Sequence, residues 1–100
     1  MHMAGISQNN FDIEVVKALS DEVRLEIMNI IGHREMMVNE IADKTSVSRP
    51  TVSHHLQILK RAGIVTSRKE GKEMYYSVNM YTLTSLSESI LKFVTFGFLE

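Results

Sequence analysis

The sequence predicts a mainly α-helical domain that carries one small β-hairpin, with its elements in the order α-α-α-α-β-β-α. Three observations support this prediction. Apolar residues recur at helical spacing through most of the chain, which is typical of amphipathic helices. The pattern changes to a strand-like alternation after Gly63 and becomes helical again near residue 82. A chain of 100 residues supports one hydrophobic core, so we expect a single domain over 1–100.

The first two predicted helices precede Gly32. The spacing of Phe11 and Val15 predicts a helix over about 9–19. Ser20 is then the expected N-cap of a second helix, which ends at Gly32 because glycine commonly follows the last turn of a helix. The segment 1–8 is expected to be disordered or derived from a cloning vector.

The next two predicted helices are joined by a tight turn. A short helix is expected over 38–45. Ser48 stands two residues before Pro50, the only proline, and proline is well tolerated in a first helical turn. We therefore expect Ser48 to cap a helix that runs to about Ala62. Helical spacing turns Val52, Leu56 and Leu59 inward and Pro50, His54, Gln57 and Arg61 outward.

The C-terminal part of the chain predicts a hairpin and a last helix. Residues 64–68 and 74–78 resemble strands, and the polar segment 69–73 between them contains a glycine suited to a turn. A helix is expected over about 82–96, with more apolar residues than one small core needs.

Basic residues are concentrated in the middle of the chain, although the whole chain has a formal net charge of only −1. Residues 44–72 contain one acidic residue, Glu70, and seven basic ones, which gives this segment a net charge of +6. A basic segment within an acidic chain is typical of a surface that binds a polyanion, and a solvated face with uneven charge is the alternative. The basic residues are Lys44, Arg49, Lys60, Arg61, Arg68, Lys69 and Lys72.

The predicted elements follow the order of a winged helix-turn-helix: a short helix, a turn, a capped helix and a basic hairpin. In that motif the second helix enters the major groove of double-stranded DNA. Arg49 suits a bidentate contact to guanine, and the hydroxyl side chains suit phosphate oxygens. The sequence therefore predicts a DNA-binding surface made of Ser48, Arg49, Pro50, Thr51, Ser53, His54, Gln57 and Arg61 on the helix and Arg68, Lys69 and Lys72 on the wing.

Three segments carry a resemblance to arsenic-repressor-like (ArsR) transcriptional regulators: VKALSDEVRLEI at 16–27, SRPTVSHHLQILKRAGIV at 48–65 and KEGKEMYYSV at 69–78. The resemblance implies a homodimeric repressor that binds an inverted-repeat operator, with Arg49, Ser53 and His54 near the DNA. The absence of cysteine favours the reducing cytoplasm as the compartment. It also implies dimerisation through the first helix and the helix of 82–100. The expected interface residues are Phe11, Val15, Leu83, Leu86, Ile90, Phe93 and Val94.

The chain departs from the family at its usual metal sites. It has no cysteine, no histidine follows His55, and the last helix offers only Glu88 and Glu100 as acidic ligands. We therefore expect no metal and no cofactor, and the sequence does not identify the effector that regulates DNA binding. One alternative is a metal-responsive repressor with an unfamiliar site built from His2, His33 and carboxylates.

Another alternative is a winged-helix module that binds proteins and not DNA, although the basic segment argues against it. An enzyme is not expected, because Ser53 and His54 have no third orienting group and neighbours on a helix do not face each other. No apolar run approaches the roughly 20 residues of a membrane helix, so we expect no membrane partner.

Overall fold

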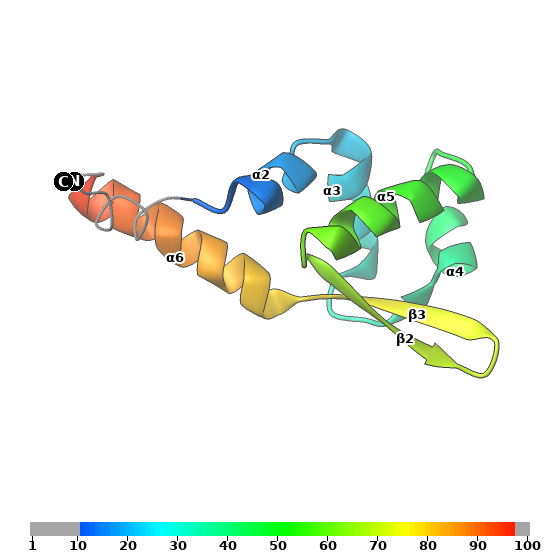
Figure 1. The fold of residues 1–100 in the computed structure, drawn as a ribbon. Coiled ribbons are helices and arrows are strands. Elements are labelled where there is room, and N and C mark those ends of the chain that lie inside the picture. The colour runs from blue at the N-terminus through cyan, green and yellow to red at the C-terminus, as the bar shows by residue number, and fades with distance from the viewer. Residues whose placement is uncertain (1–10, 98–100) are drawn as a thin grey trace.

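Five helices and three short strands follow one another along residues 11–97, the part of the chain that this computed structural model describes (Figure 1). The expectations for residues 1–8 and 98–100 lie outside the described residues. The predicted order is confirmed, with one short strand added. The elements are α2 (Ile13–Leu19), α3 (Glu22–Ile31), β1 (Met36–Met37), α4 (Val38–Ala42), α5 (Arg49–Arg61), β2 (Val65–Glu70), β3 (Glu73–Val78) and α6 (Met80–Phe96).

The N-cap of α3 is Asp21 and not Ser20, so that prediction was wrong by one residue. The Asp21 carboxylate accepts hydrogen bonds from the backbone N–H groups of Val23 at 2.8 Å and Arg24 at 3.1 Å. The Ser20 hydroxyl instead donates to the carbonyl oxygen of Val16 at 2.8 Å, at the end of α2. A carboxylate is the stronger acceptor at a helix N-terminus, and its charge complements the helix dipole there.

Ser48 is the N-cap of α5, as predicted. Its backbone is extended, and its hydroxyl oxygen lies 3.4 Å from the backbone nitrogen of Thr51. The preceding helix is shorter than expected, because α4 ends at Ala42 and residues 43–47 form the turn. Within that turn the Thr45 hydroxyl lies 3.1 Å from the carbonyl oxygen of Val47, which offers the backbone an alternative to a further helical turn.

The sheet is antiparallel with strand order β1-β3-β2. Strands β2 and β3 form the predicted hairpin, but its turn is only Gly71 and Lys72, shorter than the expected 69–73. Gly71 has a φ of 62°, which glycine adopts without strain. The unpredicted β1 pairs Met36 with Tyr76, so it joins the start of α4 to the hairpin.

The core lies among α2, α3, α4, α5 and the sheet. The predicted inner face of α5 is confirmed, since Val52, Leu56 and Leu59 are fully buried. At the far end of this helix, the carbonyl oxygen of Gly63 accepts a hydrogen bond of 2.8 Å from the Thr82 hydroxyl, which fixes the start of α6 against the end of α5. The core of 11–97 therefore holds α5 by one face and leaves its other face open.

Helix α6 extends away from the body of the molecule (Figure 1), and the described chain measures 50 × 27 × 21 Å. The helix begins at Met80, two residues earlier than predicted, with Asn79 as its N-cap. None of its 17 residues is buried. Over residues 11–97, no helix combines the length and the apolarity needed to cross a membrane.

Candidate nucleic-acid interface

The outer face of α5 is open to solvent along its whole length. Thr51 and Ser53 are half-buried, at the border between this face and the core. The helix has basic residues and no acidic ones, and its first turn is free of carboxylates that would repel a phosphate. The remaining predicted DNA-binding residues of this segment are exposed, namely Ser48, Arg49, Pro50, His54, Gln57 and Arg61.

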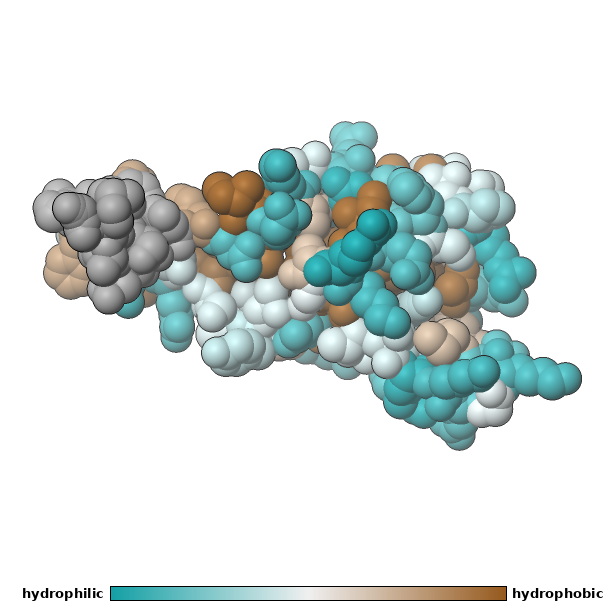
Figure 2. Space-filling view, viewed as in Figure 1, coloured by the Kyte–Doolittle hydropathy of each residue, from teal (hydrophilic) through white to brown (hydrophobic). Residues whose placement is uncertain are grey.

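The turn of the hairpin, the first turn of α4 and the start of α5 border one surface cleft. Arg49 and Lys72 line the same surface cleft, of about 180 Å³, although they are 23 positions apart in the sequence. The wing also forms a hydrophilic projection at the lower right of the space-filling view (Figure 2). Lys69 is exposed on this projection as well. The structure thus brings Arg49 of the helix and Lys72 of the wing to one cleft, whereas Arg61 lines a different cleft, between α2 and the last turns of α5.

Asn39 is a residue of this surface that the sequence analysis missed. It is exposed in the first turn of α4 and lines the same cleft as Arg49 and Lys72. Its signal in the sequence is a polar residue directly after Val38, at the start of the first helix of the helix-turn-helix. An amide side chain at this place suits a hydrogen bond to a phosphate oxygen.

The guanidinium of Arg68, a predicted DNA-binding residue of the wing, is paired within the chain. Its Nε lies 2.8 Å from Oε2 of Glu35, and its Nη1 lies 2.6 Å from Oε1 of Glu70. The guanidinium also stacks 4.8 Å from the centre of the Tyr75 ring. The hydrogen bond and charge of Arg68 lower the pKa of Glu35, and the two carboxylates raise the pKa of Arg68. Arg68 therefore ties the wing to the segment before β1, and its contact with DNA stays a prediction.

The neighbouring histidines of α5 point to different surroundings. His54 is exposed, whereas His55 is half-buried with its Nδ1 atom 3.1 Å from Nη1 of Arg24. Residues 11–97 contain no group of three or more His, Asp or Glu side chains arranged to hold a metal ion. His2, which the metal-responsive alternative required, lies outside the described residues.

A groove of about 430 Å³ separates the N-terminal part of α2 from α6, and both sides of it carry apolar residues. Phe11, which lines the groove, meets Phe93 of α6 edge to face, with ring centres 6.1 Å apart. Ile90, Phe93 and Val94 are exposed by 45%, 42% and 72%, which leaves a large apolar surface on α6. Figure 2 shows hydrophobic surface in this region.

The other predicted interface residues lie deeper. Val15 is 2% exposed and belongs to the core of the single chain, and it also lines the groove between α2 and α6. Leu83 and Leu86 are half-buried against the same core.

Residues 21–67 match the family described as "Bacterial regulatory protein, arsR family". The transcriptional repressor SdpR of Bacillus subtilis (strain 168) is 35% identical over 83 residues, which cover 83% of this chain and 92% of SdpR. An ArsR-like transcriptional regulator from Rhodococcus sp. RHA1 superposes with a TM-score of 0.76 at 28% identity, over 92% of this chain and 81% of that one. The homodimeric winged helix-turn-helix DNA-binding domain of Mb0332 from Mycobacterium bovis gives a TM-score of 0.67 at 31% identity, over 83% and 80% of the two chains.

Proposed function

The chain belongs to the arsR family of bacterial regulatory proteins, and we propose that it represses transcription in the cytoplasm as a homodimer bound to an inverted-repeat operator in double-stranded DNA. One observation carries the proposal furthest. Arg49 at the start of α5 and Lys72 at the tip of the wing line one cleft. A helix in the major groove and a wing beside it need cations on both elements, facing the same way.

Each element of this surface has its own task. The first turn of α5 enters the major groove, where Arg49 donates two hydrogen bonds to guanine and His54 and Gln57 contact neighbouring base edges. The hydroxyl groups of the segment, together with Lys69 and Lys72 on the wing, bind phosphate oxygens and fix the register of the protein on the duplex.

The second copy of the chain covers α6 in this proposal. A helix of 17 residues with none buried leaves its apolar stripe in water, and pairing with the same stripe of a second copy removes that stripe from solvent. The groove between α2 and α6 continues this surface, so both helices contribute to the interface. A two-fold axis through the interface then presents the two α5 helices to the two halves of an inverted repeat.

The test is a fluorescence anisotropy titration with DNA from upstream of the protein's own gene. Unlabelled random DNA is the competitor, and a fragment whose inverted repeat has been scrambled is the matched control. The titration is repeated over a range of salt concentrations, because each phosphate contact contributes about −0.9 to the slope of log affinity against log salt. A chelator arm separates a metal-dependent repressor from one that needs no metal.

Binding to the native fragment that survives the competitor and exceeds binding to the scrambled fragment supports the proposal. Equal and salt-insensitive binding to both fragments would contradict it and would favour a module that binds proteins. Light scattering of the same preparation tests the dimer directly.

A further inference from the structure

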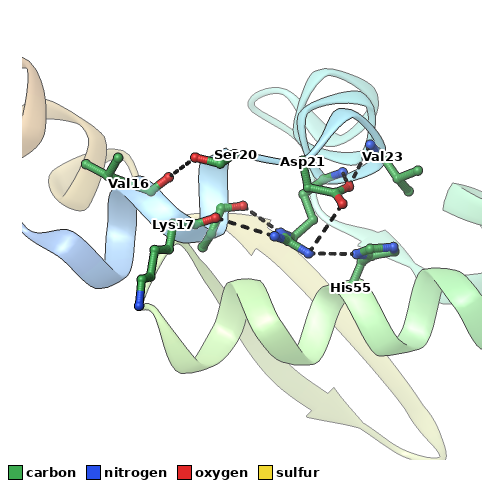
Figure 3. Close-up of polar contacts among 8 residues, drawn as sticks. Val16, Lys17, Ser20, Asp21, Val23 and His55 are labelled. Atoms are coloured by element: carbon green, nitrogen blue, oxygen red, sulfur yellow. Dashed lines mark hydrogen bonds and ion pairs between the residues drawn. The ribbon is translucent and has the colours of Figure 1, made fainter.

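Arg24 of α3 joins the end of α2 to the recognition helix α5. Its Nε donates to the carbonyl oxygen of Ala18 at 2.6 Å, and its Nη2 lies 3.4 Å from the carbonyl oxygen of Lys17. Its Nη1 lies 3.1 Å from Nδ1 of His55, on the face of α5 behind the DNA-binding surface. Figure 3 shows these contacts meeting at one guanidinium. The side chain of Arg24 is only 13% exposed, so water competes little for them.

The same guanidinium is held from a third side. Oδ2 of Asp21 lies 3.8 Å from Nη1 of Arg24, and the Asp21 carboxylate caps the helix from which Arg24 projects. The backbone hydrogen bond from Arg24, a further one from Val23 and the charge of Arg24 lower the pKa of Asp21. The contacts with Asp21, Lys17 and Ala18 therefore hold the guanidinium of Arg24 in place independently of His55.

A cleft of about 310 Å³ lies between α2 and the last turns of α5. Lys17 and Ala18 line it from α2, Ile58, Arg61 and Ala62 line it from α5, and Arg24 reaches into it. At this cleft, apolar packing alone does not set the angle between the two helices. The hydrogen bonds of Arg24 cross from one helix to the other and supply a directional contact there.

We propose that Arg24 and His55 are positioning residues that fix the angle of α5 relative to the dimer-forming helix α2, and thereby determine which spacing between operator half-sites the dimer accepts. This inference rests on the proposed function. In a dimeric helix-turn-helix protein the two recognition helices reach half-sites at a set separation along the duplex. Because α2 belongs to the interface and α5 reads the DNA, the contact between them sets that separation.

The chemistry of the contact indicates which variants test it. A guanidinium has donors and no acceptor, so Nδ1 of His55 must accept and the ring hydrogen lies on Nε2. The amide oxygen of an asparagine stands at the place of Nδ1, whereas that of a glutamine stands near the place of Nε2. His55→Asn therefore keeps an acceptor in front of Arg24, and His55→Gln moves it away. His55→Leu removes it altogether.

The experiment measures the affinity of each dimeric variant for the operator fragment and for two versions of it, with one base pair inserted or removed at the centre. The measured quantity is the ratio of native-spacing affinity to altered-spacing affinity. We expect this ratio to fall about tenfold in His55→Leu and His55→Gln, the loss that one charge-assisted hydrogen bond supports, and to be retained in His55→Asn. The salt dependence and the affinity for random DNA should stay at the parent values, because no phosphate contact is lost.

A parent-like ratio in folded, dimeric His55→Gln and His55→Leu would overturn the inference and leave the proposed function standing. Equal loss in His55→Asn and His55→Gln would overturn it too, since the acceptor position would then be irrelevant. Should His55→Leu fail to fold, the comparison between the Asn and Gln variants decides alone. A parent protein that prefers no operator over random DNA would instead refute the proposed function, and the inference with it.

Discussion

The guanidinium of Arg68 in β2 lies against the carboxylate of Glu35, with Nε 3.0 and 2.8 Å from its two oxygens and Nη2 2.9 Å from Oε1. The two residues are 33 positions apart, and they join the wing to the segment that leads into β1 and α4. This pair places a negative charge against the guanidinium of the wing and fixes the wing beside the helix-turn-helix.

Glu35→Gln is expected to strengthen binding to random DNA. The substitution removes a negative charge close to the wing and leaves Arg68 with Glu70 as its remaining carboxylate partner, so the guanidinium becomes more available to phosphate. Anisotropy titrations with random DNA should give a tighter dissociation constant and a steeper salt slope than the parent. Glu88→Gln, which removes the same charge from α6, is the control. A decrease in affinity in Glu35→Gln would show that the ion pair serves DNA binding by holding the wing in place.

Arg49→Ala should weaken operator binding by about 1–3 kcal/mol per half-site and relax the preference at one base position, because a bidentate contact to guanine is lost. Operators with each base pair changed in turn locate that position. Lys72→Ala is the matched comparison, since Lys72 lines the same cleft but is proposed to contact phosphate. It should weaken all sequences alike and lower the salt slope by about one per contact. Parent-like binding by both variants would remove this cleft from the interface.

Ile90→Glu should convert the dimer into a monomer. Ile90 is 45% exposed on the apolar stripe of α6, and a buried carboxylate without a partner is strongly unfavourable in an interface. Lys92→Glu places a carboxylate on an exposed position two residues further along, about 200° around the helix from Ile90, and should leave the dimer intact. Light scattering over a concentration series distinguishes them, and a dimeric Ile90→Glu would place the interface elsewhere.

Asp21→Asn should make the protein less sensitive to acid. The backbone hydrogen bonds from Arg24 and Val23 and the charge of Arg24 lower the pKa of Asp21 from its ordinary value of 3.8. A folded pKa below the unfolded value means that the carboxylate stabilises the fold above pH 3.8 and that this contribution is lost as the pH falls through the lower, folded pKa. Urea unfolding at pH 7 and pH 3 should therefore show a smaller difference between the two pH values in the variant. An unchanged difference would exclude Asp21 from the acid response.

The sequence predicts the parts of the fold that local chemistry controls. The cap at Ser48, the inner face of α5 and the hairpin after Gly63 follow from capping, helical spacing and a change of period. The first N-cap prediction failed because Ser20 and Asp21 are neighbours of similar preference, and the competition between them depends on where α2 ends. Strand β1 was not predicted because two residues are too few to show the alternation typical of a strand. Its conformation depends on its pairing with β3.

The contacts that assemble the site are different in kind. Arg24 meets His55 across 31 positions, and Arg68 meets Glu35 across 33. Such pairs form only when α3, α5 and the hairpin pack together. The side-chain pattern of a single segment does not predict that packing. The sequence therefore predicts Arg68 as one of the cations of the wing, but does not predict that its guanidinium forms ion pairs with carboxylates of the same chain.

Helix α6 has a consequence for how the regulator responds to its own abundance. Because none of its described residues is buried in a single chain, the proposed dimer is what removes the apolar stripe of α6 from water. Where dimers are the minor species, their number grows with the square of the chain concentration, so halving the protein lowers the dimer about fourfold. A modest change in synthesis or degradation thus becomes a sharper change in operator occupancy, and the number of copies in the cell acts as a control signal in its own right.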